Sequence, residues 1–442
     1  MASTRITKTF SGNGDRQKFT LSMWIKRATT GQAFVFTTGS YASTSMQQWF
    51  FDSDATLGLY TYNSSGSQLS RLVTNRKFRD TNAWYHIVFR IDTTQSTAAN
   101  RMRIYVNGVQ ETSFAHSDYI TQNENYIYSE SITAQYFGQR ADQGNTSSFD
   151  GVMSHIHMCD GYSYDASSFG ETDSTTGEWK IKTSPSVSYG TNGYWILKDG
   201  NTVTDSSTNS NDFAVTGTLT KTEDNPSNVF ATINPLYRHS ATYANGNLKS
   251  TNASNKFGGV ASIGVISGKY YAEFKYGSAS NQNGAVGIYG NPQNGSYDNQ
   301  GVGKDGNSYS YRSDDGNKVI GNSSSSYGNT FASGNIISIA LDLDNNKLYF
   351  AKDGVWQNSG VPTSGSTGTG AIDISLTPPE GYWFIAANCN SASDTAVWEH
   401  NYGNGYFGTT QISSEGTNAS GNGKFEYDVP TGYTALCTKG LN

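Results

Sequence analysis

The chain has 442 residues, of which 48 are glycine and only 8 are proline, and charged side chains make up 15% of it. This length suggests two or three domains, and the scarcity of proline argues against a proline-rich disordered chain. The net charge is −6 and no basic run is present, which argues against nucleic-acid binding. No apolar run approaches the ~18 residues of a membrane-spanning helix.

The cysteines and the N-terminal sequence concern the compartment in which the chain folds. Cys159, Cys389 and Cys437 are far apart and odd in number, which fits neither a disulfide framework nor a zinc site. The first residues contain no apolar secretory region. We therefore expect free thiols and synthesis in the cytoplasm without a signal peptide.

Short strands with period-two alternation are predicted along the first half of the chain. In residues 18–27, Phe19, Leu21, Met23 and Ile25 share one face, whereas Trp24 lies on the other. Further strands are predicted at residues 32–38, 48–52, 56–62, 84–92, 101–111 and 149–159. Asn107-Gly108 is the strongest hairpin signal, because both residue types tolerate positive φ.

Several of these motifs occur in an order that resembles the laminin-G-like, concanavalin-A-like jelly roll. The resemblance covers roughly residues 5–170. It rests on Trp24, Lys26, Arg27, Trp84, Tyr85, His86, Tyr105, Asn107, Gly108, Phe149, Asp150, Gly151, Asp160 and Gly161.

Residues 189–213 are predicted to return to the first domain as an edge strand, at Tyr194–Leu197. The polar run 205–212 looks like a turn that often opens laminin-G-like domains, but here it follows the main strands. The first domain is therefore expected to span residues 1–218. Residues 219–235 are expected to form a linker, stiffened by Pro226 and Pro235.

The second predicted domain, residues 236–442, is organised around residues 335–357. Ile337, Ile339 and Leu341 alternate with polar or small residues, and turns are predicted at Asn345-Asn346 and Asp353-Gly354. This stretch resembles the central hairpins of SPRY domains, which are interaction modules without chemistry of their own. The predicted fold is all-β, two jelly-roll-like antiparallel β-sandwiches in tandem, with no helix of any length.

Because concanavalin-A-like folds include glycan hydrolases, a catalytic pair of carboxylates is one possibility for this chain. Retaining enzymes of that kind place two carboxyl groups about 5–5.5 Å apart, and no glutamates here have the strand spacing that such a pair needs. Asp342 and Asp344 share a strand face, but we interpret them as a solvated polar face and a turn acceptor. We expect no enzymatic activity.

Two places in the sequence carry candidate metal ligands. Asp205, Asn209, Asn211 and Asp212 offer oxygen ligands at loop spacing, as calcium would need, although Asx turns explain the same residues. His155 and His157 would face the same way on a strand, but no third ligand is evident. We expect no cofactor, with calcium as the alternative.

Tyrosines among polar residues are the remaining binding signal, because exposed aromatic rings stack on sugars or peptides. The candidate ligand-binding residues are Tyr60, Tyr62, Tyr297, Tyr309 and Tyr311, together with Tyr327. The alternative for each is a place in the core.

The linker around Asp224-Asn225-Pro226 and the C-terminal stretch 432–437 resemble junctions of bacteriophage structural proteins, and the two sandwich types together resemble virion proteins of marine tailed phages. The resemblance implies a non-enzymatic protein on the virion surface, in a tail fibre or as capsid decoration. It also implies a homo-oligomer such as a trimer, contacting other virion proteins and a host-surface glycan. An independent lectin or a concanavalin-A-like glycan hydrolase is the alternative, and an intracellular SPRY-type adaptor is less favoured because no accompanying module is evident.

Overall fold

The computed structural model describes residues 4–39, 45–63, 65–126, 128, 130–131, 133–140, 147–198, 200, 202–236, 241–253, 257–278, 283–290, 301–304, 306–389 and 395–441. The chain divides into two compact units, Met1–Lys221 and Thr222–Asn442. Both are built almost entirely from antiparallel strands, which confirms the predicted all-β fold class. Helix is limited to α1 (Ala98–Arg101) and short 3-10 turns among these residues.

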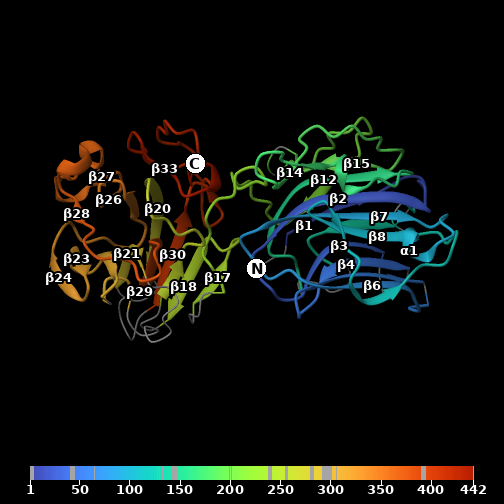
Figure 1. The fold of residues 1–442 in the computed structure, drawn as a ribbon, viewed down its shortest axis with the longest axis horizontal. Coiled ribbons are helices and arrows are strands. Elements are labelled where there is room, and N and C mark those ends of the chain that lie inside the picture. Colours follow the sequence, from blue (N-terminus) through green and yellow to red (C-terminus); the bar gives the residue numbers. More distant parts are fainter. Residues whose placement is uncertain are drawn as a thin grey trace. The chain divides into compact units, whose positions relative to one another are not determined.

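The first unit is a sandwich of two sheets (Figure 1, blue to green). One sheet has the strand order β10 (Phe114–Asp118), β6 (Gln68–Lys77), β5 (Thr56–Tyr62), β4 (Met46–Phe51), β3 (Ala33–Gly39), β11 (Ala134–Phe137), β1 (Arg5–Thr9) and β16 (Ala214–Thr216). The other has the order β15 (Tyr194–Ile196), β12 (Gly151–Asp160), β2 (Lys18–Arg27), β7 (Trp84–Asp92), β8 (Met102–Val106) and β9 (Val109–Gln110). We call these the eight-stranded and the six-stranded sheet of the first unit.

The core of the first unit follows the predicted alternation. Phe19, Leu21, Met23 and Ile25 of β2 all lie in the cluster between the sheets. Within the predicted return of residues 189–213, β15 forms an edge strand beside β12. The chain then adds β16, which was not predicted and which pairs with β1. The Asn107-Gly108 turn joins β8 to β9 with positive φ at both residues, which is the geometry of the favoured two-residue hairpin.

A further layer covers the outer face of the six-stranded sheet. Residues 161–190 cross that face, with 3-10 turn η1 (Ala166–Ser168) and the hairpin β13 (Gly170–Thr172) and β14 (Trp179–Ile181). Phe169 and Trp179 pack there against Val88 and Tyr105 of the sheet. The outer face of β2 is therefore buried, with Ser22 0% and Lys26 3% exposed.

The second unit is also a sandwich (Figure 1, yellow to red). Its larger sheet runs β17 (Thr242–Ala244), β18 (Lys249–Ala253), β30 (Thr395–Asn401), β20 (Lys269–Ser278), β25 (Ile336–Asp342), β26 (Lys347–Lys352) and β27 (Val355–Trp356), with β28 (Ile372–Asp373) on β26 and β33 (Thr434–Ala435) on β20. The smaller sheet runs β19 (Phe257–Val260), β29 (Phe384–Cys389), β21 (Gly284–Tyr289), β22 (Ser308–Arg312), β23 (Asn317–Ile320) and β24 (Ser323–Ser326). The remaining elements are the hairpin β31 (Tyr406–Phe407) and β32 (Thr410–Gln411) and the 3-10 turns η3 (Gln357–Ser359), η4 (Pro362–Thr367) and η5 (Thr438–Leu441).

The C-terminal segment covers the outer face of the larger sheet. Phe425, Val429 and Tyr433 pack against Tyr271 and Ala340 of β20 and β25. This cover corrects the interpretation of Asp342 as part of a solvated face, because the residue is fully buried. Its carboxylate accepts hydrogen bonds from the backbone and the side chain of Asn345 and pairs with Lys269 Nζ at 2.9 Å. Of the two predicted roles of Asp342, the structure therefore supports the turn acceptor and not the solvated face.

The stretch predicted as a linker packs within the second unit over much of its length. Phe230, Ala231 and Ile233 are at most 1% exposed. The Ala231 amide donates to Leu436 O at 2.9 Å, and Phe230 bridges Cys437. The prolines suggested an extended crossing, but the apolar residues between them are buried by the C-terminal segment.

Candidate functional site

An aromatic row crosses the outer face of the eight-stranded sheet, and we take it as the candidate binding face. Trp49, Leu57 and Leu59 point into the core. Because side chains alternate along a strand, Phe50 of β4 and Tyr60 of β5 lie on the opposite face. Their ring centroids are 5.0 Å apart in an edge-to-face arrangement, and Phe34 of β3 lies 5.4 Å from Phe50.

Tyr60 and Tyr62 form the accessible end of this row. Both are half-buried, and their ring centroids are 6.2 Å apart. Phe34 and Phe50 are each 4% exposed, so they support the row rather than present a surface. The two tyrosines that the sequence nominated together are therefore adjacent and partly accessible.

A glycine in β5, Gly58, allows the rings of the aromatic row to approach the sheet closely. Gly58 lies directly across from Phe50 in the β4–β5 register. A Cβ at Gly58 would lie 3.0 Å from two ring atoms of Phe50 and 3.4 Å from a ring atom of Tyr60. Glycine within a strand often marks such a close approach, and here it lets both rings lie against the sheet.

Two arginines border the aromatic row. Arg71 of β6 lies across from Tyr60; its guanidinium is 5.0 Å from the ring centroid and its Nε donates to Tyr60 Oη at 3.0 Å. Arg140 lies 5.4 Å from the ring centroid of Phe34. Both distances are in the range of cation–π attraction. Arg71 is half-buried beside Tyr60, so this end of the row combines an aromatic surface with hydrogen-bond donors.

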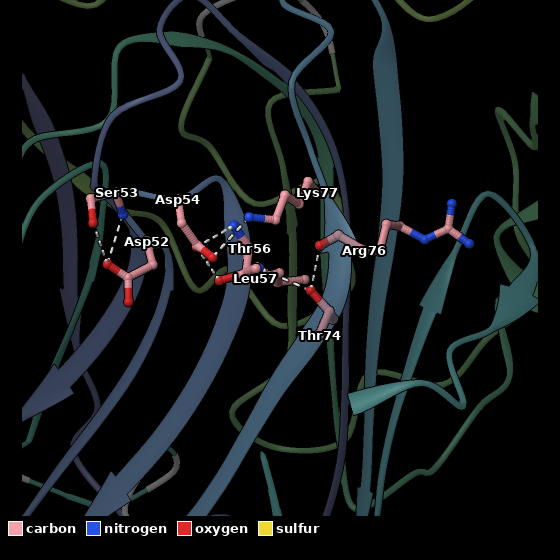
Figure 2. Close-up of polar contacts among 8 residues, drawn as sticks. All are labelled: Asp52, Ser53, Asp54, Thr56, Leu57, Thr74, Arg76 and Lys77. Carbon is pink, nitrogen blue, oxygen red and sulfur yellow. Dashed lines mark hydrogen bonds and ion pairs between the residues drawn. The ribbon is translucent and has the colours of Figure 1, made fainter. Parts of the chain in front are cut away.

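Polar contacts hold the β4–β5 turn at one end of the row (Figure 2). Asp54 accepts from the Thr56 amide at 3.1 Å and from its hydroxyl at 2.7 Å, and pairs with Lys77 Nζ at 3.2 Å. These hydrogen bonds, and then Lys77, lower the pKa of Asp54. The Thr74 hydroxyl accepts from Leu57 N and donates to Arg76 O, so β5 and β6 are fixed in register beside the aromatic row.

The structure does not bring the other nominated tyrosines to this face. Tyr309 and Tyr311 of β22 are fully buried in the core of the second unit, so their prediction as exposed binding residues is wrong. The Tyr309 hydroxyl accepts from Ser375 N and Leu376 N, and the Tyr311 hydroxyl donates to Asn329 O. Tyr327 is also in this core, and Tyr297 lies outside the described residues.

The calcium candidates form a network of hydrogen bonds within the loop. Asp205 is 8% exposed, and its two oxygens accept from Trp195 N, Ser207 N, the Ser207 hydroxyl and Asn211 N at 2.8 Å each. Asp212 accepts from the Asp205 amide. The Asn209 and Asn211 amides both donate to Gly193 O. The residues fit the Asx-turn interpretation, because the aspartate oxygens accept from donors of the loop and the asparagine side chains donate to backbone oxygens.

The two strand histidines differ in their surroundings. A bulge in β12 gives His155 a φ of +46°, yet its ring centroid lies 6.4 Å from that of His157, so the two rings are neighbours as predicted. His157 is buried, its Nδ1 is 2.9 Å from Tyr189 Oη, and its ring stacks on Trp195 at 4.9 Å. Within the described part of the chain, no three His, Cys, Asp or Glu side chains gather as a metal site.

Phe34, Phe50 and Arg71 are the members of the candidate face that sequence reasoning missed. A signal was available, since Phe50 follows the core residue Trp49 by one position and Gly58 interrupts an otherwise apolar strand. The cross-strand register of β4, β5 and β6, which alternation alone does not give, places them beside Tyr60.

The fold is that of a protein with two β-sandwich units. Residues 4–166 match the family model for the concanavalin A-like lectin/glucanases superfamily, and residues 269–372 match the model for the SPRY domain. The chain thus carries a concanavalin-A-like domain and a SPRY domain in tandem, as the resemblances implied. No curated protein sequence matches it.

Solved structures show likenesses to parts of the chain. The SPRY domain of human HERC1 is 19% identical, with 38% of this chain and 96% of that chain covered and a TM-score of 0.30. A native heptameric SAP-like pentraxin from Limulus polyphemus is 15% identical, with 36% and 76% covered and a TM-score of 0.25. A human SPRY domain is 15% identical, with 39% and 96% covered and a TM-score of 0.26.

The matched domains are compatible with a role in binding carbohydrate or protein. Among the residues described, no helix combines the length and the apolar character that a membrane crossing needs.

Proposed function

We propose that the protein is a non-enzymatic glycan-binding protein whose first unit binds sugar on the aromatic row of the eight-stranded sheet. The observation that carries this proposal is the adjacency of Tyr60 and Tyr62, with Arg71 hydrogen-bonded to Tyr60. Aromatic faces stack on the apolar faces of sugar rings, while neighbouring donors bind hydroxyl oxygens. The half-buried tyrosines are held by the β4–β5 register, so little conformational entropy is lost on binding.

We further propose that the protein acts on the surface of a bacteriophage virion, as the resemblance of its junction sequences implies, in a tail fibre or as capsid decoration. Assembly with further copies or other virion proteins is part of this proposal. An uncharged edge strand supports the assembly part of this proposal. Strand β24 consists of four exposed serines and forms one edge of the smaller sheet of the second unit. Edge strands without charged residues or proline are open to pairing with another chain.

Replacing Tyr60 with alanine is expected to weaken glycan binding about two- to tenfold, since an aromatic contact contributes about 0.5–1.5 kcal/mol. A glycan array on the full chain identifies the ligand, and titration calorimetry compares the variants. Tyr382→Ala removes a tyrosine that is 48% exposed in the second unit and serves as the matched control. Equal affinities of wild type and Tyr60→Ala would exclude the aromatic row as the binding site.

The assignment to a virion is tested separately. Mass spectrometry of purified phage particles from the source of this sequence is expected to detect the chain at many copies per particle. Light scattering on the purified chain is expected to show a homo-oligomer. A strict monomer that is absent from particles would favour the alternative of an independent lectin.

A further inference from the structure

A cavity lies in the first unit at the edge strand of the six-stranded sheet, which is not the sheet that carries the aromatic row. Its volume is about 430 Å³. Two segments form its walls, residues 185–190 and residues 206–209, with the side of β15 between them. The lining includes Val187, Ser188, Tyr189, Trp195, Ser207 and Thr208. Among the described residues, those that line the cavity are all uncharged, so the cavity suits a neutral ligand.

Hydrogen bonds tie the two walls together, so the cavity is largely preformed. The Asn209 side-chain amide donates to Gly190 O at 2.6 Å and to Gly193 O at 3.0 Å. The Ser206 amide donates to Trp195 O at 2.7 Å. On the strand side, the Trp195 amide donates to Asp205 Oδ1. Because both backbone groups of Trp195 are engaged, a peptide cannot add here as a further strand.

Trp195 provides the aromatic wall. Its ring stacks on His157 with centroids 4.9 Å apart, and Lys198 Nζ lies 4.6 Å from its centroid. The Tyr189 hydroxyl lies 2.9 Å from His157 Nδ1, which fixes the neighbouring wall. Trp195 is only 9% exposed, so its orientation is set by packing.

The indole N–H of Trp195 lacks a hydrogen-bond acceptor. Nε1 is buried and has no partner among the described residues. A buried donor without an acceptor costs free energy, and a native site normally supplies the acceptor. This unpaired donor belongs to a residue that lines the cavity.

We propose that this cavity is a second glycan site that holds one neutral sugar unit. Trp195 and Tyr189 offer aromatic surface, while Ser188 and Thr208 offer hydroxyl groups for the ring substituents. This balance of aromatic and hydroxyl groups suits a sugar ring better than a charged or fully apolar ligand. The inference extends the proposed glycan-binding function and rests on it, but it makes the first unit bivalent through a site of its own.

The test is 19F NMR of the full chain labelled with fluorotryptophan, in which the Trp195 signal is assigned from Trp195→Phe. The probes are neutral monosaccharides and disaccharides of glucose, galactose, mannose and N-acetylglucosamine at millimolar concentrations, with a neutral tetrapeptide for comparison. The Trp195 signal is expected to shift with at least one sugar and not with the peptide. It is expected to do so equally in Tyr60→Ala, because that residue belongs to the other sheet.

Two matched variants separate binding in the cavity from indirect effects. Thr208 is an exposed residue that lines the cavity, and Thr204 is an exposed residue of the same loop that does not. Thr208→Tyr fills the cavity and is expected to abolish the shift, whereas Thr204→Tyr is expected to retain it. A Trp195 signal that no sugar moves, that only the peptide moves, or that still shifts in Thr208→Tyr overturns the proposal. Loss of binding in Tyr60→Ala alone concerns the aromatic row and not this cavity.

Discussion

Replacing Glu273 with alanine is expected to destabilise the second unit by about 4 kcal/mol, a loss typical of a broken buried polar network. Glu273 of β20 is fully buried. Its carboxylate accepts from Glu426 N at 2.8 Å, Tyr427 N at 2.9 Å, the Tyr271 hydroxyl at 3.0 Å and the Asn401 side-chain amide at 3.3 Å. Burial raises the pKa of Glu273 to about 7, against the lowering effect of these four donors. Removing the carboxylate leaves the Glu426 and Tyr427 amides without this acceptor. Tyr271 and Asn401 each lose one of two partners, since they also bond to Ser338 Oγ and Lys424 O.

The C-terminal segment that covers the larger sheet is expected to detach before the whole unit unfolds, because two of the donors, the amides of Glu426 and Tyr427, belong to it. Denaturant unfolding measures the stability, and hydrogen exchange at the amides of Glu426 and Tyr427 is expected to accelerate. Glu415→Ala is the control, since its exposed pair with Lys424 contributes at most about 1 kcal/mol. A Glu273→Ala protein as stable as Glu415→Ala would contradict the anchoring role.

The second large effect is a loss of stability in acid through buried histidines. His86 is fully buried, and burial lowers its pKa from 6.5 to about 3. Its Nδ1 accepts from Trp179 Nε1 at 2.9 Å, so Nε2 carries the proton and donates to the Ser22 hydroxyl, also 2.9 Å away. Protonation would place a second donor against Trp179. Burial also lowers the pKa of His157 well below its ordinary value.

The lowered pKa of His86 determines how the stability of the first unit changes with pH. Above pH 6.5 the imidazole is neutral in both states, so stability does not depend on it. Between about pH 6.5 and 3 the unfolded chain binds the proton and the folded chain does not, so stability falls with the pH. At about pH 5 the expected loss for His86 is about 2 kcal/mol.

Denaturant unfolding of the first unit at about pH 7 and about pH 5 measures this loss. His86→Asn retains an acceptor for Trp179 and cannot titrate, so its stability is expected to depend less steeply on pH. The control is His116→Asn, at an exposed residue of β10, which is expected to keep the wild-type dependence of stability on pH. The pH dependence of the second unit has the opposite sign, because the raised pKa of Glu273 lowers the stability of that unit as the pH rises from 4.5 to about 7. Equal slopes for wild type and His86→Asn would contradict the prediction.

The strands and turns could be predicted from the sequence because their signals are local. Period-two alternation places Phe19 and Ile25 in one core and Ile337 and Leu341 in the other. The outer layers could not be predicted, since residues 161–190 and the C-terminal segment bury their apolar residues without a regular period. Asp342 was therefore assigned to solvent although the C-terminal segment covers its strand.

The candidate face was predicted only in part for a related reason. Tyr60 and Tyr62 were recognised from their polar neighbours, but the same criterion selected Tyr309 and Tyr311, which alternate with Ser308 and Ser310 and point into the core. Polar neighbours along a chain do not show which face of a strand is covered. The position of Arg71 beside Tyr60 depends on the register between β5 and β6, which alternation along the chain does not determine.

The structure of the complex with a glycan identified by the array tests the central claim most directly. The account predicts a sugar ring against Tyr60 and Tyr62, with a hydroxyl oxygen within hydrogen-bond distance of Arg71. A glycan bound only to the second unit, or an outer face of the eight-stranded sheet left free at saturating ligand, would contradict it.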